Sequence, residues 1–374
     1  MNIILGLTGS VAATLAPKLV QRLLKLGNVA VVTTERAKEF YRPLELQAMA
    51  MGLPNLTYYD DATEWLLWKR KGDPVQHIDL RKWGHVLVIA PLTANTLAKM
   101  ANGIADNLLT SIVRAWDYNK PMILAPAMNT LMMEHPLTER QLQAVRDFDW
   151  QSDSGNKNVV VVNPVEKVLA CGDEGTGAMA SIEDVVLGIE NATRWQWPLF
   201  RANGLPFGNH PGAFGFRRKH DVHTGVDLYT GKNSAVFAME TGKVVKVIPF
   251  TGAQFGYPWW ENTSAVLVEG PSGVICYGEV EPHDSIKKGE SVRKGQAIAR
   301  VTPVLPEGKE RLDIPGHSRS MLHIELYTHL YEDKSRGIWE GWDLNAPNKP
   351  ERLLDPTKKL LAARPMHVPL LILP

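Results

Sequence analysis

The sequence predicts two domains of different class, a doubly wound α/β domain with a parallel sheet followed by an all-β antiparallel domain. Three observations support this prediction. The chain has 374 residues, more than a single hydrophobic core usually holds. Apolar runs of strand length alternate with helical segments over the first half, and short β-like runs punctuated by glycine fill the second half.

The first half of the chain alternates strand and helix signals. Residues 2–7 form an apolar run of strand length, followed by a glycine-containing turn. Leucines then recur at helical spacing, at Leu15, Leu19, Leu23 and Leu26. Further strands are expected at 29–33, 86–90, 122–125 and 159–162, and a last helix at 182–191. Because these runs are rich in valine, isoleucine and leucine, we expect strands buried on both faces of a parallel sheet.

The composition of the sequence changes near residue 195. A segment rich in glycine, proline, aromatic residues and arginine predicts a linker that packs against a domain. Apolar runs punctuated by glycine come next, at 235–248, 264–270, 273–280, 296–304 and 321–327. This spacing favours an antiparallel all-β domain. The predicted organisation is a first domain at 1–193, a linker at 194–216, a β domain at 217–362 and a tail at 363–374.

Composition and charge exclude several classes of function. The 41 Lys and Arg residues balance 40 Asp and Glu residues, so nothing indicates a nucleic-acid partner. Two cysteines cannot form a disulfide framework, which favours a reducing compartment. The N-terminal apolar run has no basic residues before it, and no apolar run reaches the roughly 18 residues of a membrane helix. We therefore expect a cytoplasmic protein without a membrane partner.

Four segments of the first domain carry glycines or polar residues where a ligand site is expected. GLTGSVAA at 6–13 joins a strand to a helix, so its N–H groups suit an anion, although such turns need glycine even without a ligand. APLTANT at 90–96 and PAMN at 126–129 end further strands. ACGDEGTGAMA at 170–180 is a glycine-rich loop with one of the two cysteines. In open α/β sheets, ligands bind at the carboxyl ends of the strands.

These segments are more specific together than singly. With TTERAKEFY, DPVQHIDLRKW, RAWD and KPMILAPAMNTLM, they resemble the phosphopantothenoylcysteine decarboxylases, a branch of the flavin-containing cysteine decarboxylases. The resemblance covers roughly residues 1–190. It implies a flavodoxin-like domain that binds FMN, a homotrimer, and decarboxylation of 4′-phosphopantothenoylcysteine to 4′-phosphopantetheine in coenzyme A biosynthesis.

The same resemblance implies roles for individual residues. His77 matches the active-site base, and Cys171 matches the proton donor. Asn129 would grip the substrate carboxylate, with Ala170 and Met179 also at the substrate. The residues implied to hold the phosphate side of FMN are Gly9, Ser10, Val11 and Thr34, and those implied to line its flavin ring are Thr93, Ala94, Asn95, Thr96 and Ala127. The sequence departs from the family at Met133, where tryptophan is usual, so we expect altered packing around the flavin.

The chemistry agrees with this assignment, because loss of CO2 from a simple cysteine amide would leave an unstabilised carbanion. Oxidation of the thiol end to a thioaldehyde by a flavin provides the electron sink. Two alternatives stay open: a related flavoprotein that decarboxylates C-terminal cysteines of peptides, and a non-enzymatic regulatory subunit on the same fold. The presence of His77, Asn129 and Cys171 favours an enzyme.

The second domain carries a candidate metal site. His223 and Asp227 have His-x-x-x-Asp spacing, and His323 lies far downstream. Two histidines and a carboxylate with an open fourth position suit zinc, although this spacing also arises by chance. The pattern HTGVDLY…TGKVV…VRKGQAIA…LHIEL resembles the zinc metallopeptidases of the lysostaphin type, family M23, over about residues 217–330. This resemblance implies that His223, Asp227 and His323 bind the metal.

The departures from the M23 pattern concern catalysis. Met321 stands where the family has the first histidine of a His-x-His motif, and Glu279 replaces the histidine of a Tyr-x-His motif. A thioether cannot transfer protons, while Glu279 could in principle act as a base. We therefore expect a zinc-binding domain without peptidase activity. The alternative is a metal-free interaction module.

Overall fold

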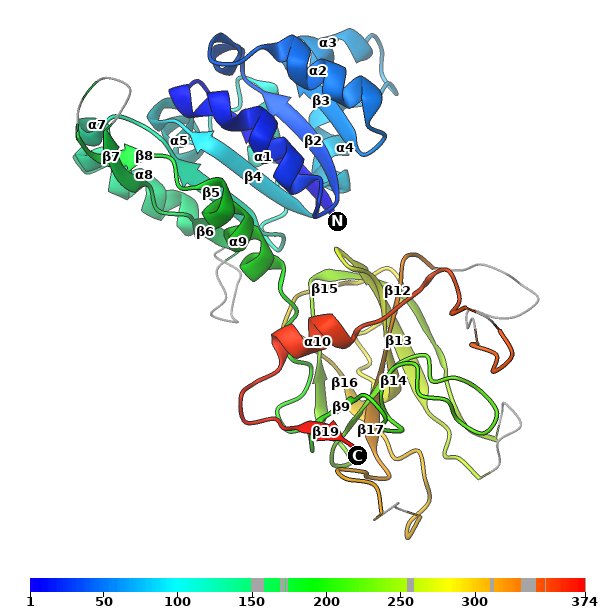
Figure 1. Cartoon of the computed structure of the whole chain (residues 1–374). Helices are drawn as coiled ribbons and strands as arrows, with labels where there is room; N and C mark the ends of the chain where they lie inside the picture. Colours follow the sequence, from blue (N-terminus) through cyan, green and yellow to red (C-terminus); the bar gives the residue numbers. More distant parts are fainter. Residues whose placement is uncertain are drawn as a thin grey trace. The chain divides into compact units, whose positions relative to one another are not determined.

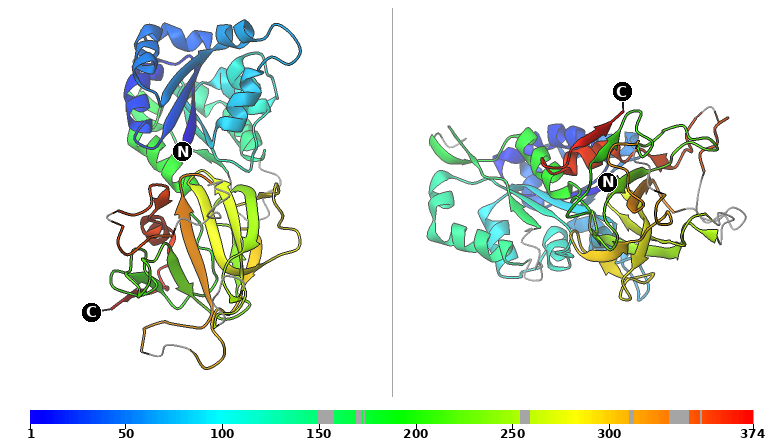
Figure 2. Two further views of the ribbon diagram at one scale, coloured as in Figure 1. Left: turned by 90° about the vertical axis from the view of Figure 1, so that its right-hand side faces the viewer. Right: turned by 90° about the horizontal axis from the view of Figure 1, so that it is seen from below.

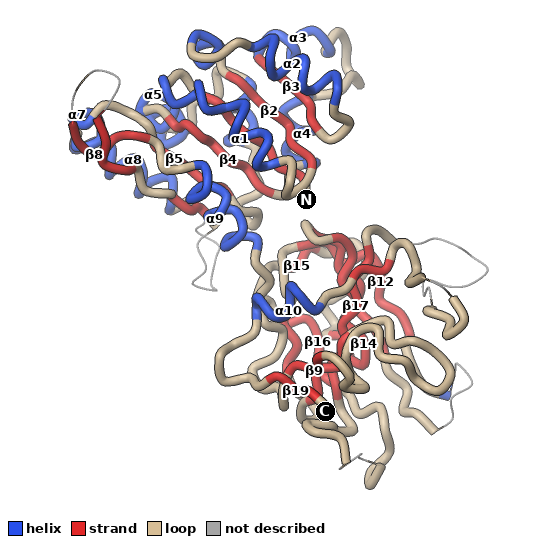
Figure 3. Tube along the Cα trace, viewed as in Figure 1, coloured by secondary structure: helices blue, strands red, loops and turns tan. Residues whose placement is uncertain are grey.

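The computed structural model describes residues 1–148, 158–168, 172, 174–253, 259–309, 313–330, 341–346 and 348–373. The chain divides into two compact units, Met1–Thr193 and Arg194–Pro374 (Figure 1). Figure 3 shows helices and strands mixed in the first unit and mainly strands in the second. The predicted succession of an α/β parallel-sheet domain and an antiparallel β domain is confirmed.

A six-stranded parallel sheet forms the centre of the first unit. Its strand order is β3-β2-β1-β4-β5-β6, so the direction in which strands are added reverses between β1 and β4. The strands are β1 (Asn2–Leu7), β2 (Asn28–Thr33), β3 (Leu56–Asp60), β4 (Val86–Leu92), β5 (Met122–Pro126) and β6 (Val159–Val161). The edge strand β3 was not among the expected strands, because its sequence LTYYD has no continuous apolar run.

Helices cover both faces of this sheet, as Figure 2 shows. The side chain of Ile3 packs with α1, α2 and α9, whereas that of Ile4 packs on the other face with α4, α5, α6 and α8. Two 3-10 helices, Val11–Leu15 and Glu35–Glu39, follow β1 and β2. The α-helices are α1 (Ala16–Leu23), α2 (Pro43–Gly52), α3 (Asp61–Leu67), α4 (Gln76–Trp83), α5 (Ala94–Ala101), α6 (Leu108–Arg114), α7 (Thr130–Glu134), α8 (Pro136–Arg146) and α9 (Ile182–Thr193).

A short antiparallel hairpin precedes the last helix of the first unit. It consists of β7 (Val165–Val168) and β8 (Glu174–Ala178). Within the part of the chain that the structure describes, no helix is long and apolar enough to cross a membrane.

The second unit is built on an antiparallel sheet with the path β10-β17-β14-β13-β12-β15. Strand β16 joins it through β14 and also pairs with β11, and β18 pairs with β17. The strands are β10 (Val226–Tyr229), β11 (Ala235–Phe237), β12 (Gly242–Pro249), β13 (Ser264–Gly270), β14 (Gly273–Pro282), β15 (Ser291–Val292), β16 (Ala297–Val301), β17 (Met321–Tyr327) and β18 (Leu353–Leu354). One helix, α10 (Thr357–Ala363), follows them.

The two segments expected to flank the β domain are part of its compact unit. In the expected linker, Trp195, Trp197 and Leu199 are buried in the core of the second unit. Strand β9 (Leu205–Phe207) of the same segment pairs in parallel with β19 (Leu370–Ile372) of the expected tail. The expected linker and the expected tail therefore both bury apolar residues within the second unit.

Candidate functional site

The carboxyl ends of β1 and β4 are joined by one threonine. Thr8 Oγ1 accepts the backbone N–H of Thr93 at 3.0 Å and donates to the carbonyl oxygen of Pro91 at 2.7 Å. The turn after β1 and the segment after β4 are thereby held side by side. They meet where the strand order reverses, the usual ligand crevice of a doubly wound sheet.

The turn after β1 is tight. Ser10 begins the first 3-10 helix, and its Oγ accepts the Ala12 N–H at 3.3 Å. At Gly9, an added Cβ would lie 2.7 Å from Arg36 Cβ, so glycine is needed for this close approach. Thr34 follows β2, is 9% exposed, and donates from its hydroxyl to the Leu7 carbonyl at 3.2 Å. The implied phosphate-side residues Gly9, Ser10 and Thr34 therefore lie together at the carboxyl ends of β1 and β2, next to Val11.

The segment after β4 begins helix α5 at this same edge. Thr93 is the N-terminal cap of α5, and its Oγ1 accepts the Thr96 N–H at 3.3 Å. Thr96 is buried, whereas Asn95 is exposed and Ala94 is half-buried. Four of the five implied flavin-lining residues, 93–96, are thus the cap and first turn of one helix.

The segment after β5 lies next to the glycine-rich hairpin. Ala127 is buried and donates its N–H to the Leu92 carbonyl at 2.9 Å, which places it beside the end of β4. The Met128 N–H donates to the Gly177 carbonyl at 3.0 Å. An added Cβ on Gly177 would lie 2.2 Å from the Met128 carbonyl oxygen, so β8 can approach this closely only through glycine. Asn129 then caps α7, where its Oδ1 accepts the Leu131 N–H at 2.9 Å.

Of the other two implied substrate residues, the structure describes Met179 but not Ala170. Met179 follows β8 and is buried in the core beneath α1 and α9. Ala170 and Cys171 lie outside the described residues. Met133, the residue that replaces the family's tryptophan, is half-buried against the core on the α5 and α8 face.

His77 lies in the first turn of α4 and has a carboxylate partner. Its Nδ1 is 2.6 Å from Oε1 of Glu64 in α3, and Glu64 is buried. The sequence did not reveal Glu64 as a site residue. The two residues are thirteen positions apart on different helices, so no helical or strand periodicity links them.

The residues at the sheet edge suit the FMN that the resemblance implies. Glycine, hydroxyl groups and helix-starting N–H groups are the donors that phosphate requires. Only glycine lets the turn after β1 lie this close to Arg36, and the hydroxyls of Ser10 and Thr34 lie beside this turn in the fold. The small side chains of Ala94 and Ala127 suit a planar ring.

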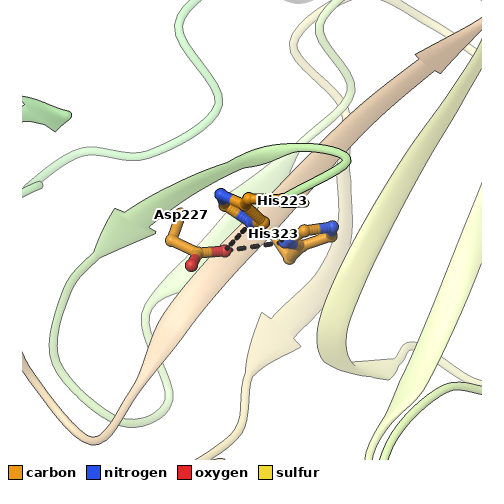
Figure 4. Close-up of side chains that lie close together, drawn as sticks. All are labelled: His223, Asp227 and His323. Atoms are coloured by element: carbon orange, nitrogen blue, oxygen red, sulfur yellow. Dashed lines mark hydrogen bonds and ion pairs between the residues drawn. The ribbon is translucent and has the colours of Figure 1, made fainter. Parts of the chain in front are cut away.

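In the second unit, strand register brings together three candidate metal ligands from distant parts of the chain. Asp227 in β10 lies directly opposite His323 in β17. The ligand atoms of His223, Asp227 and His323 all lie within 4.8 Å of one another (Figure 4). His223 Nε2 is 3.3 Å from His323 Nδ1 and 3.2 Å from Asp227 Oδ1, and Asp227 Oδ1 is 2.7 Å from His323 Nδ1.

The outward atoms of the same three side chains have partners of their own. His223 Nδ1 is 2.9 Å from the Ala213 carbonyl oxygen, and His323 Nε2 is 3.2 Å from Glu325 Oε1. Asp227 Oδ2 accepts from Arg218 at 2.9 Å. Such contacts orient the ring nitrogens of metal-binding histidines. They leave His223 Nε2, His323 Nδ1 and Asp227 Oδ1 facing one another.

Burial and close charges shift the pKa values of these groups. Burial opposes ionisation of Asp227, yet His223, His323 and Arg218 together hold its pKa well below the ordinary value. Burial also disfavours a charged His323, but the hydrogen bonds to Asp227 and Glu325 raise its pKa to about 10. Burial lowers the pKa of His223. The metal-free site thus favours one proton held on His323 between two carboxylates.

The two positions that depart from the M23 pattern lie on neighbouring strands. Glu279 is 3% exposed, has φ 62°, and lies where the register of β13 and β14 shifts. Its Oε2 accepts from the hydroxyls of Thr251 and Thr263, each at 2.8 Å, and burial raises its pKa to about 7. Met321 pairs with Tyr229, two positions along β10 from Asp227.

Comparison with known proteins covers the first half of the chain. A family model described as Flavoprotein matches residues 1–194. The phosphopantothenoylcysteine decarboxylase of Mus musculus is 48% identical over 191 residues, which are 50% of this chain and 85% of the relative. That of Arabidopsis thaliana is 45% identical over 179 residues, 48% of this chain and 78% of the relative.

Solved structures also match this half. One, described as the FMN binding protein AtHal3, is 43% identical, with a TM-score of 0.44, and the match covers 51% of this chain and 95% of that one. With 194 of its 374 residues matched by the family model, the chain belongs to the Flavoprotein family, and its N-terminal half is homologous to the phosphopantothenoylcysteine decarboxylases.

Proposed function

We propose that the first unit catalyses FMN-dependent decarboxylation of 4′-phosphopantothenoylcysteine to 4′-phosphopantetheine, a step of coenzyme A biosynthesis. The observation that carries this proposal is the 48% identity to the mouse phosphopantothenoylcysteine decarboxylase over 191 residues. The arrangement of the sheet edge supports it, because the polar ends of β1, β2, β4 and β5 lie together there.

The proposed cofactor site divides into two parts. Gly9, Ser10, Val11 and Thr34 would hold the phosphate side of FMN, while 93–96 and Ala127 would line its ring system. When bound, FMN supplies the two-electron oxidation of the terminal cysteine thiol to a thioaldehyde, from which CO2 leaves readily.

The proposed roles of the side chains follow from their chemistry. His77 takes the thiol proton at Nε2, since Nδ1 is engaged by Glu64. Asn129 orients the substrate carboxylate through a neutral amide, so no ion pair has to break when CO2 leaves. Cys171, which lies outside the described residues, is assigned as the donor that protonates the enethiol on the basis of the resemblance alone. Small residues at 127 and 94 leave room for the substrate beside the ring.

The decisive experiment combines an absorption spectrum with a substrate assay. The purified protein should be yellow and should release CO2 from 4′-phosphopantothenoylcysteine, but not from a peptide ending in cysteine. A colourless protein that FMN cannot reconstitute would contradict the proposal, and preference for the peptide would favour the peptidyl-cysteine alternative. Cys171→Ser should release CO2 and accumulate the enethiol, whereas normal product from this variant would remove the proton-donor role.

For the second unit we propose a zinc site in a domain without peptidase activity. Tetrahedral zinc with bonds of about 2.0–2.1 Å holds its ligand atoms about 3.3 Å apart. The three ligand atoms here are 3.3, 3.2 and 2.7 Å apart, so only small side-chain shifts are needed to receive the metal. The absence of histidine at positions 279 and 321 supports the loss of peptide hydrolysis. Cleavage of glycyl peptides by the zinc-loaded protein would contradict this part of the proposal.

A further inference from the structure

Glu64 and His77 come from different helices and meet through a short contact. Glu64 lies in α3 and His77 in the first turn of α4, and Glu64 Oε1 is 2.6 Å from His77 Nδ1. The side chain of Glu64 is 10% exposed, whereas that of His77 is 29% exposed. A carboxylate so shielded from water interacts with its partner more strongly than a surface carboxylate does.

The helix that carries Glu64 is itself held in place at its start. Asp60 Oδ1 accepts the Thr63 N–H at 3.0 Å, and Thr63 Oγ1 accepts the Asp60 N–H at 3.1 Å, which completes a capping box. Asp61 Oδ1 accepts the Leu108 N–H at 2.8 Å, so the start of α3 is tied to the start of α6. Glu64 follows within one turn, on an element whose position is fixed from two sides.

Glu64 differs from the other carboxylates at the start of α3 and in the first turn of α4 in the groups that it contacts. Asp60 is engaged by Lys38 at 2.8 Å. The pKa of Asp61 is raised by burial and by the charges around it, of which Glu64 is one. Asp79 lies in the same first turn of α4 as His77, but among the described contacts none joins its carboxylate to the ring. Glu64 is therefore the carboxylate in contact with the imidazole.

We propose that Glu64 is a positioning residue for His77 in the decarboxylase reaction, an inference that rests on the function proposed above. By accepting the hydrogen bond of Nδ1–H, Glu64 fixes the tautomer in which Nε2 carries the lone pair. Nε2 would take the thiol proton when the bound flavin oxidises the thiol, and the resulting imidazolium would lie against the carboxylate. Glu64 itself takes no proton and touches no substrate.

Glu64→Gln tests this inference, because it keeps the shape and the hydrogen-bond acceptor but removes the charge. In a single anaerobic turnover with 4′-phosphopantothenoylcysteine, we expect flavin bleaching to slow by about 10- to 100-fold. KM should change by less than about threefold.

Asp60→Asn is the matched control. Asp60 and Glu64 are each 8% exposed and belong to the same helix start, and both substitutions remove one buried negative charge. Asp60 contacts Lys38 rather than His77, so its variant should leave the bleaching rate within about threefold of wild type even where it lowers the melting temperature. In a double-mutant cycle, Glu64→Gln should cause no further loss once His77 is replaced by asparagine.

The outcomes separate the inference from the function on which it rests. Normal bleaching by Glu64→Gln, or losses that add in the His77→Asn background, would show that Glu64 only links α3 to α4. If the wild-type holoenzyme neither bleaches nor releases CO2, the decarboxylase function itself is wrong. Slower bleaching with a nearly unchanged KM and a non-additive cycle supports the positioning role.

Discussion

Asp227 and His323 lie directly opposite each other on antiparallel strands β10 and β17, with Asp227 Oδ1 2.7 Å from His323 Nδ1. The pairing register thus places two residues that are 96 positions apart on one face of the sheet. His223 enters from the turn before β10, four positions ahead of Asp227. The geometry of this group leads to the first prediction.

His223→Ala should abolish zinc binding by the second unit. The wild-type protein should retain about one zinc ion per chain after dialysis against metal-free buffer, because three ligands converge with oriented ring nitrogens. The variant should retain less than about a tenth of that. The measurement is elemental analysis, with His283→Ala as the control, since His283 lies outside the three-residue group. Equal metal content in wild type and His223→Ala would mean that the group does not bind zinc.

The buried carboxyl of Glu279 should make the metal-free second unit less stable as pH rises. Burial raises its pKa from 4.5 to about 7, so the folded state binds the proton more tightly than the unfolded state. This contribution is fully present below pH 4.5 and is lost as pH rises through about 7. A shift of this size corresponds to about 3 kcal/mol at most.

The melting temperature should be measured by calorimetry across this pH range, in the presence of a metal chelator. Glu279→Gln keeps an acceptor for the two threonine hydroxyls and should flatten the dependence of melting temperature on pH. Glu281→Gln, an exposed position of the same strand, should leave the dependence unchanged. Parallel curves for wild type and Glu279→Gln would show that the pKa of Glu279 is the same in the folded and the unfolded protein.

Gly9→Ala should weaken FMN binding. An added Cβ would lie 2.7 Å from Arg36 Cβ and 3.2 Å from the Arg36 carbonyl carbon and oxygen, so the turn after β1 would have to shift. We expect the dissociation constant, measured by flavin fluorescence, to rise by about tenfold, equivalent to about 1.4 kcal/mol. Gly52→Ala is the matched control, because nothing lies within 4 Å of the added Cβ. Unchanged affinity in Gly9→Ala would place the phosphate site elsewhere.

The protein should be a trimer with a mass of three times 41.6 kDa in solution. Besides the family resemblance, this prediction draws on a cluster of apolar side chains around α3, where Trp65 is 70%, Leu66 66% and Trp68 47% exposed. Light scattering should show the trimer for wild type and smaller species for Leu66→Asp. Leu187→Asp, an exposed position of α9, should not change the mass. A monomeric wild type would contradict the prediction.

The sequence predicted those elements of the fold whose burial pattern is strong. Strands β1, β2, β4 and β5 lie where apolar runs were found, because strands covered on both faces must be apolar throughout, and the edge strand β6 was found from its run of valines. The edge strand β3 has no such requirement and was not predicted. The segment around Trp195 was predicted as a linker, since amino-acid composition alone does not show which domain covers its aromatic residues.

By itself, the sequence determined the division into an α/β half and an all-β half, the family of the first half, and the residue types available for chemistry. Periodicity and family motifs are local patterns, so they suffice for these conclusions. Only the tertiary structure decided which residues meet: Thr8 with Thr93, Glu64 with His77, and His223 with Asp227 and His323. Such contacts depend on strand order, register and helix packing, which arise from the whole chain.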